Sequence, residues 1–357
     1  MIQRAYSSLR AIMTVEIDES NPYDGREVVN QVWWHEDYEA IREQAGCVEL
    51  PGWSRIELRG ADRGRLLNSL GTNRLDDLES GRARETFLTD AKGHVVAHGL
   101  VVADKEATSF LTGGPRGDTI ANHFAKYIIR EDVQVDDRSI QTAVWYLGGR
   151  HAETALENLG IPVPQELGEH ANATLEGAVV KVCRVDMAGP VGFLLVAAQD
   201  RARHVAHAVQ RKVKTCVRAA FESARIQWGW PLDRVDISSD NFPQEVGRNE
   251  RAISFTKGCY IGQETVARLD SLGHVNKRLM LVHFPSGELA ASASLSVRGK
   301  PVGTTTSMGY SPELACPVAL AYIRREAAEP GAVLESSIGP AETVSPGWQT
   351  QVRGGEL

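Results

Sequence analysis

The order of strand and helix patterns between residues 54 and 137 constrains the fold more than any other feature of this chain. Residues 54–59 alternate, with Ile56 and Leu58 facing one side, as a half-buried strand does. A helix that Asp62 can cap follows and ends at Gly71. The remaining patterns are strands at 84–89, 94–103 and 107–112, a helix from Pro115 to about Ile129, and a strand through Val133 and Val135. The order β-α-β-β-β-α-β predicts a ferredoxin-like α+β unit with an added strand.

The rest of the chain has different patterns on either side of this unit. A length of 357 residues suggests two or three domains. Further helices are expected at 35–45, 151–159, 200–213 and 216–228, and strands at 142–147, 178–186 and 191–198. Residues 231–256 are irregular, and a segment of that length is usually functional or disordered. Short strands separated by glycine and proline after about residue 278 predict a small C-terminal β-barrel or sandwich.

Composition excludes several classes of protein. A formal net charge of -7 argues against a general nucleic-acid-binding surface. No apolar run approaches the length of a membrane span. The five cysteines are scattered without a C-x-x-C pair, so neither a zinc site nor a disulfide framework is indicated, and we expect a reducing, cytoplasmic location. The first 13 residues contain arginine and serine but no acid, and we interpret residues 1–30 as a flexible tail; if they are a transit peptide, the location is mitochondrial.

The chemistry concentrates in residues 257–268, which read Lys-Gly-Cys-Tyr-Ile-Gly-Gln-Glu-Thr-Val-Ala-Arg. Cys259 precedes an expected helix, and helix N–H groups and the Lys257 ammonium would favour a thiolate. A free cysteine is also commonly a small buried hydrophobe. Lys257 and Arg268 could attract an anion or could be solvated, and Trp53 could close a core or form a flat wall for an aromatic ligand. These alternatives are open at the level of residue pattern.

The assembled motifs resemble the YgfZ family of folate-binding proteins, relatives of the aminomethyltransferase (T-protein) of the glycine cleavage system. The most specific match is the block from Lys257 to Glu264, which includes Gly258, Cys259, Tyr260, Gly262 and Gln263 and continues through Arg268. Weaker matches are Trp53 with the following Gly60-Ala61-Asp62, Asp90-Ala91-Lys92-Gly93, Arg225-Ile226-Gln227-Trp228-Gly229 and Pro243-Gln244. The resemblance covers about residues 35–325.

The resemblance implies a three-domain ring around a folate channel. A discontinuous folate-binding domain would comprise residues 31–53 and 138–274, the ferredoxin-like insert residues 54–137, and the β-barrel residues 275–357. Trp53 and Phe221 would flank a tetrahydrofolate, with Gln227, Lys257, Tyr260 and Arg268 also contributing. Gln227 stands where the transferases commonly carry a glutamate, and residues 93–98 carry no acid where the transferases have one.

The resemblance therefore implies a folate-binding accessory protein for iron–sulfur cluster assembly or repair, with Cys259 as its reactive thiol. Its partners would be folate and iron–sulfur client or assembly proteins, and one cysteine would not hold a permanent cluster. The alternative is a folate-dependent aminomethyl or one-carbon transferase. A third possibility is a scaffold with a vestigial folate site. Whether the chain is an enzyme is left open by the sequence.

Overall fold

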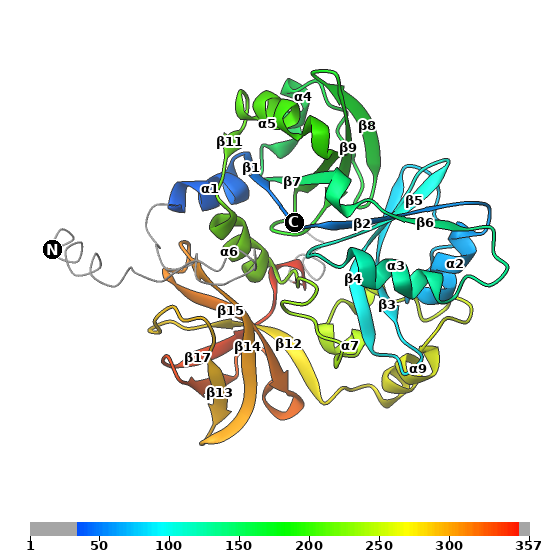
Figure 1. Ribbon diagram of the computed structural model, residues 1–357. Coiled ribbons are helices and arrows are strands. Elements are labelled where there is room, and N and C mark those ends of the chain that lie inside the picture. The colour runs from blue at the N-terminus through cyan, green and yellow to red at the C-terminus, as the bar shows by residue number, and fades with distance from the viewer. Residues whose placement is uncertain (1–33, 350–357) are drawn as a thin grey trace.

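A computed structural model describes residues 34–349 and contains two β-sheets and a closed β-barrel (Figure 1). The six-stranded sheet has the order β11-β1-β7-β10-β9-β8, and the five-stranded sheet has the order β3-β4-β5-β2-β6. The barrel has the order β12-β15-β14-β13-β16-β17. The predicted α+β class with a ferredoxin-like unit and a C-terminal barrel is confirmed. The tail at residues 1–30 lies outside the described residues.

The six-stranded sheet is covered on both faces. Its strands are β1 (Gly46–Glu49), β7 (Thr142–Gly148), β8 (His170–Leu175), β9 (Ala178–Val185), β10 (Gly192–Ala198) and β11 (Lys214–Thr215). Its helices are α1 (His35–Glu43), α4 (Ala152–Asn158), α5 (Ala202–Gln210) and α6 (Arg218–Trp228). One apolar core lies between this sheet and α1 and α6, and a second core lies between the sheet and α4 and α5. Strand β8 has no counterpart among the predicted elements.

The five-stranded sheet follows the predicted order closely. It contains β2 (Ser54–Arg59), β3 (Arg82–Thr89), β4 (Val95–Ala103), β5 (Ala107–Thr112) and β6 (Gln134–Asp137), with α2 (Arg63–Leu70) and α3 (Gly117–Ala125). Helix α3 ends four residues before the predicted Ile129, whose side chain is exposed. Asp62 does not cap α2 through its side chain; its carboxylate accepts the Asp132 backbone N–H at 2.9 Å instead.

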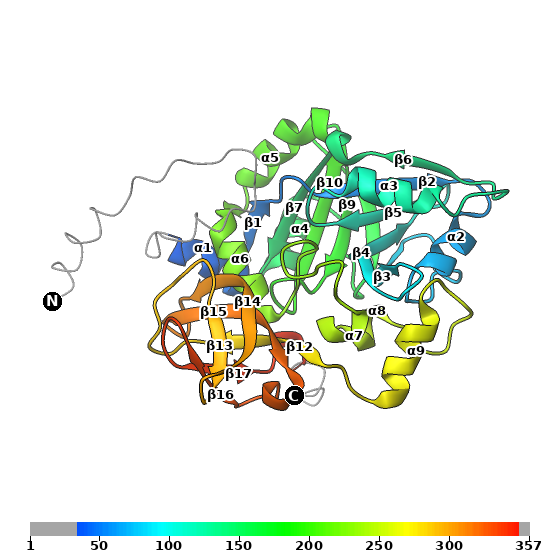
Figure 2. The ribbon, with the colours of Figure 1, turned by 60° about the horizontal axis from the view of Figure 1, so that its bottom comes forward.

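The irregular segment after α6 contains two one-turn helices, α7 (Pro243–Val246) and α8 (Asn249–Ala252), followed by α9 (Gln263–Leu272). An apolar cluster joins this segment to the five-stranded sheet through Phe87, Val95, Val246 and Tyr260. Figure 2 shows α7, α8 and α9 lying beside β3 and the start of the barrel. Residues 243–274, which are predicted to belong to the discontinuous folate-binding domain, pack in part against the ferredoxin-like insert and in part against β12.

The barrel closes the chain. Its strands are β12 (Lys277–His283), β13 (Ser294–Val297), β14 (Lys300–Ser311), β15 (Cys316–Arg324), β16 (Val333–Ser336) and β17 (Ala341–Val344). Helix α6 packs against β14, where Tyr310 N–H donates to Ser223 Oγ at 3.1 Å and links the barrel to the first core. Within residues 34–349, no helix combines the length and apolar character needed to cross a membrane.

Candidate functional site

Lys257 holds the cysteine motif against the end of α2. Its Nζ donates to the carbonyl oxygens of Asn68, Gly71 and Asn73 at 2.6, 2.6 and 2.7 Å. These carbonyls belong to the end of α2 and the turn after it, where a helix has acceptors without intrahelical donors and favours a cation. The structure thus uses all three ammonium protons within the protein, and none is directed at an external anion.

The environment acts on the charge of Lys257 in two directions. Burial lowers the pKa of the ammonium to about 7. The three carbonyls oppose this effect, because a neutral amine has only two protons for three acceptors. The Tyr260 ring lies 4.9 Å from Nζ and adds a cation–π contact. We infer that Lys257 remains an ammonium in the folded protein.

The remainder of the motif is anchored to the β3–β4 turn. Gly262 has a φ of +83°, and a Cβ at this position would lie 2.4 Å from the Asp90 carbonyl oxygen and 2.7 Å from Gly93 Cα. Thr89 Oγ1 donates to the Ile261 carbonyl at 2.5 Å. Only glycine fits this close approach. The two sequence motifs around Gly93 and Gly262 are therefore packed against each other.

Cys259 lies between these anchors, and it alone of the five cysteines is exposed. Burial raises the pKa of Cys183 and Cys216 to about 12, so those thiols remain protonated and unreactive. A Cβ added at Gly258 would meet no atom within 4 Å. Arg268 lies on α9, and its side chain is exposed. Gln263 is half-buried and Glu264 is exposed in the first turn of α9. The motif therefore presents one accessible thiol on a fixed platform.

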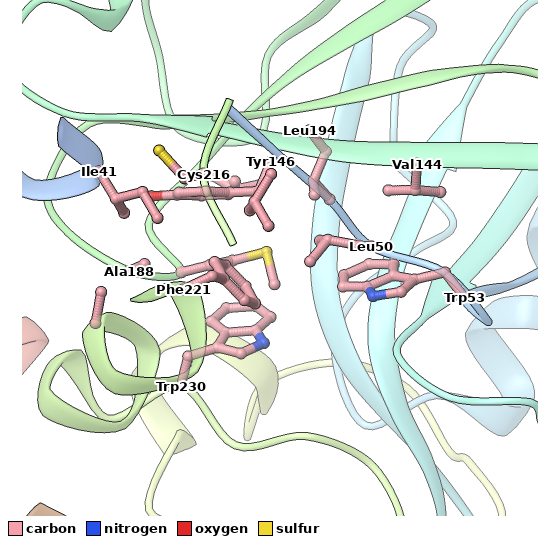
Figure 3. Close-up of a cluster of buried hydrophobic side chains, with 14 of the residues drawn as sticks. Ile41, Leu50, Trp53, Val144, Tyr146, Ala188, Leu194, Cys216, Phe221 and Trp230 are labelled. Carbon is pink, nitrogen blue, oxygen red and sulfur yellow. The ribbon is translucent and has the colours of Figure 1, made fainter. Parts of the chain in front are cut away.

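Trp53 and Phe221 are both core residues. Trp53 is 6% exposed and Phe221 is 1% exposed, and both belong to the cluster between the six-stranded sheet and α6. The Phe221 ring centroid lies 5.0 Å from that of Tyr146, and Leu50 lies between Trp53 and Phe221 in the view of Figure 3. The structure packs the two rings into one core, and a pocket that Trp53 lines has a volume of only about 10 Å³.

This packing predicts a moderate loss of stability for Phe221→Leu. We expect the free energy of unfolding to fall by about 1–2 kcal/mol, because the smaller side chain loses contact with Tyr146. Urea denaturation followed by circular dichroism measures this change. If Phe221 instead faced a ligand channel, the substitution would leave stability unchanged and weaken folate binding.

Gln227 lies at the contact between α1, α6 and the barrel. Its Oε1 accepts from the Tyr38 hydroxyl at 2.7 Å, and its Nε2 donates to Glu313 at 3.2 Å. Both ends of the amide are therefore occupied by protein groups. A contact between Gln227 and a pterin would have to compete with these two hydrogen bonds, and it stays a prediction.

A cavity of about 520 Å³ lies between the two sheets and α8. Its walls come from β3, β4, β9, the loop after β9 and α8, and they include Glu85, Leu100, Asp186, Trp230 and Arg251. It combines one flat aromatic wall with several charged groups. Nine of its eighteen lining residues are charged, so the cavity suits a ligand with several charged or hydrogen-bonding groups.

A buried ion pair supports one wall of this cavity. Arg248 donates to both oxygens of Glu85 at 2.7 and 2.6 Å, and His98 Nε2 lies 2.7 Å from Glu85 Oε1. Burial raises the pKa of Glu85, but Arg248 and His98 outweigh it and hold that pKa at about 2. The Arg248 guanidinium stacks between Trp230 and Trp348, with 4.6 and 4.9 Å to the ring centroids. Glu85 is therefore an ionised structural carboxylate.

Asp186, a second buried carboxylate of the cavity, has fewer hydrogen bonds than Glu85. It is 6% exposed, and its Oδ2 accepts no hydrogen bond from the residues of the described range. Arg251 Nη2 lies 3.3 Å from that oxygen. Burial raises the pKa of Asp186, and the Arg248 guanidinium opposes the rise. Arg251 is thus an ion-pair partner that donates no hydrogen bond to this oxygen, which can accept one from a ligand N–H group.

Most of these cavity residues are not indicated by any local sequence pattern. Arg248 and Arg251 lie in the irregular stretch 231–256, which we had singled out by its length alone. Glu85 lies in the middle of β3, where it is buried and contacts His98 and Arg248. The ion pair of Glu85 with Arg248 joins positions 163 residues apart, which no local pattern reveals.

Comparison with known proteins agrees with the fold. A model described as the GCVT N-terminal domain matches residues 10–257, and one described as the glycine cleavage T-protein C-terminal barrel domain matches residues 277–346. An aminomethyltransferase of Corynebacterium aurimucosum is 27% identical over 321 residues, which are 85% of each chain. A chloroplastic Arabidopsis thaliana protein named as a transferase is 27% identical over 290 residues; the match covers 80% of this chain and 66% of that protein.

The solved structure of the glycine cleavage system aminomethyltransferase T from Bartonella henselae has the same architecture. It matches with a TM-score of 0.79 and 17% sequence identity, over 88% of each chain. At that identity the likeness concerns the fold. Together with the two matched domain models, it leads to one conclusion: this chain belongs to the glycine cleavage T-protein (GCVT) family.

Proposed function

We propose that this protein binds a tetrahydrofolate in the cavity between its two sheets. The observation that carries the proposal is the buried Oδ2 of Asp186, in a cavity of about 520 Å³. This oxygen has Arg251 Nη2 at 3.3 Å but accepts no hydrogen bond from the described residues. A pterin offers an exocyclic amino group and a ring N–H, which are the donors that this oxygen lacks. Trp230, although only 4% exposed, contributes aromatic surface to the lining.

The rim of the cavity suits the carboxylates of a folate tail. Arg82, Arg84 and Arg184 line it, and each is paired with a carboxylate that is at least two-fifths exposed. Exposed ion pairs contribute little to stability, so these arginines can exchange a protein carboxylate for one of a ligand at small cost. Lys257 is not needed for this role.

Isothermal titration of the full chain with tetrahydrofolate tests the proposal. We expect saturable binding, weakened about ten-fold by Asp186→Asn, which keeps the side-chain volume but removes the charged acceptor. Asp136→Asn, on β6 outside the cavity, is the matched control and is expected to bind like the wild type. Absence of binding would favour the vestigial scaffold, and equal binding by both variants would move the site elsewhere.

Of the roles open to a folate-binding member of this family, we propose an accessory role in iron–sulfur cluster assembly or repair. Its support is the exposed Cys259, which is held on a platform fixed by Lys257 and Gly262. A thiol so presented can engage sulfur, iron or a partner protein transiently. The YgfZ resemblance of the motif points the same way, and the expected reducing location agrees with a free thiol.

The accessory role predicts a specific effect of Cys259→Ala in cells. We expect iron–sulfur enzyme activities to fall when the only copy of the protein carries this substitution, although the fold and folate binding are retained. Thr256→Ala, a nearby exposed position, is the control and is expected to match the wild type. Equal activities for Cys259→Ala and the wild type would remove the thiol from the function.

The second candidate is a folate-dependent aminomethyltransferase. The names of the relatives support this activity more directly than they support the accessory role. Asp186, with a pKa raised by burial, also gives the cavity a carboxyl group able to exchange a proton. Formation of methylenetetrahydrofolate from tetrahydrofolate and an aminomethyl donor, lost in Asp186→Asn, would establish the transferase. Absence of turnover with intact folate binding would leave the accessory role.

A further inference from the structure

A second cavity, of about 400 Å³, lies between α7, α8, α9 and the first barrel strand β12. Figure 2 shows these elements on the side of the molecule where the described chain ends. Glu250 lines both this cavity and the proposed folate cavity. The stack of Trp230, Arg248 and Trp348 lies between the two, with Trp230 lining the first cavity and Trp348 the second.

This second cavity contains a buried acceptor without a donor. Gln244 is 7% exposed, and its Nε2 donates to the Val266 carbonyl at 2.6 Å. That bond fixes the amide orientation, because the reversed amide would place two acceptors against each other. Gln244 Oε1 accepts no hydrogen bond from residues 34–349. The buried Oδ1 of Asn249, which also lines the cavity, likewise has no donor in that range.

The charged lining is also dominated by acceptors. Three carboxylates, Glu250, Asp270 and Glu329, line the cavity, against the single guanidinium of Arg278 and the imidazole of His274. None of the three carboxylates has an ion pair with another described residue. The lining therefore offers anionic and neutral oxygen acceptors in excess of donors. Such a surface attracts a cation that carries several N–H groups.

We propose that this cavity binds a small organic ammonium ion, with Gln244 Oε1 and Asn249 Oδ1 accepting its N–H groups and Asp270 and Glu250 balancing its charge. The amide oxygens supply directed acceptors within the cavity, and the carboxylates supply the longer-range attraction. The inference does not depend on the folate proposal, because Glu250, which lines both cavities, has no part in that proposal and the other side chains line the second cavity alone.

Calorimetric titration of the full chain with putrescine tests this site, with succinate as an anionic control of similar length. We expect saturable putrescine binding and none with succinate. Asp270→Asn should weaken putrescine binding about three-fold, because it removes a carboxylate charge that solvent partly screens. Asn249→Leu, close in shape but without the acceptor, should weaken it about ten-fold. Asp200→Asn, an exposed acid on the distant η5 turn (Gln199–Arg201), makes the same charge change and should bind like the wild type.

Three outcomes would overturn the proposal. Binding heats that do not saturate as putrescine is added would mean that the second cavity holds only water. Affinity unchanged in both Asp270→Asn and Asn249→Leu would place the amine elsewhere. Saturable binding of potassium ion that competes with putrescine would identify a metal-cation site. Because Asp270 is exposed on α9, Asp270→Asn keeps the test decisive if Asn249→Leu does not fold.

Discussion

Replacing Arg248 with methionine is expected to lower the free energy of unfolding by about 3–5 kcal/mol, because it leaves the buried Glu85 carboxylate without its cation. Both side chains are almost fully buried, with side-chain exposures of 1% and 7%. The substitution also removes the group stacked between Trp230 and Trp348. Equilibrium urea unfolding monitored by tryptophan fluorescence measures the loss.

Two comparisons isolate the ion pair. The double variant Glu85→Gln/Arg248→Met removes the unpaired charge and should recover part of the loss. The folded-state pKa of Glu85, about 2, lies below its ordinary 4.5, so its stabilisation is present above pH 4.5 and is lost as the pH falls toward 2. Arg248→Met should weaken this acid dependence. A single-variant loss below about 1 kcal/mol would mean that the wall does not depend on the pair.

Lys257→Met is expected to lower the free energy of unfolding by about 3–6 kcal/mol, since three carbonyls near the end of α2 lose their donor at once. Thermal and urea unfolding measure the change. The matched control is Lys92→Met on the exposed β3–β4 turn, which should stay within about 0.5 kcal/mol of the wild type.

The same variant distinguishes the structural role of Lys257 from the anion-binding role expected from sequence. If the ammonium held a folate carboxylate, Lys257→Met would weaken folate binding while stability changed little. The hydrogen bonds of Lys257 predict the opposite pattern, with a large stability loss and folate affinity preserved under conditions where the variant is folded.

Local patterns were sufficient where an element is determined by its own residues. The strands Ser54–Arg59 and Ala107–Thr112 were predicted with the bounds that the structure has. Strand β8 was missed because only His170 and Leu175 are buried in it, so its apolar period is weak. Helices α7 and α8 are single turns that depend on tertiary contacts such as that of Val246 with the five-stranded sheet.

The candidate site was less predictable because its contacts join distant parts of the chain. The motif around Cys259 was recognised from sequence, and its cysteine is exposed; the reactive role of the thiol stays a prediction. The partners of Lys257, however, lie 184–189 residues away, so its use as a helix-end cation could not be inferred. The same is true of the charged cavity wall at Glu85 and Arg248. The sequence motif thus identified important residues, and the structure was needed to assign their individual contacts.

A structure of the protein with bound tetrahydrofolate tests the central claim most directly. The account predicts a pterin in the cavity between the two sheets, against Trp230 and with an N–H group within hydrogen-bonding distance of Asp186 Oδ2. The tail would extend toward Arg82, Arg84 and Arg184. A pterin lying between Trp53 and Phe221, with the cavity beside Asp186 empty, would contradict the account.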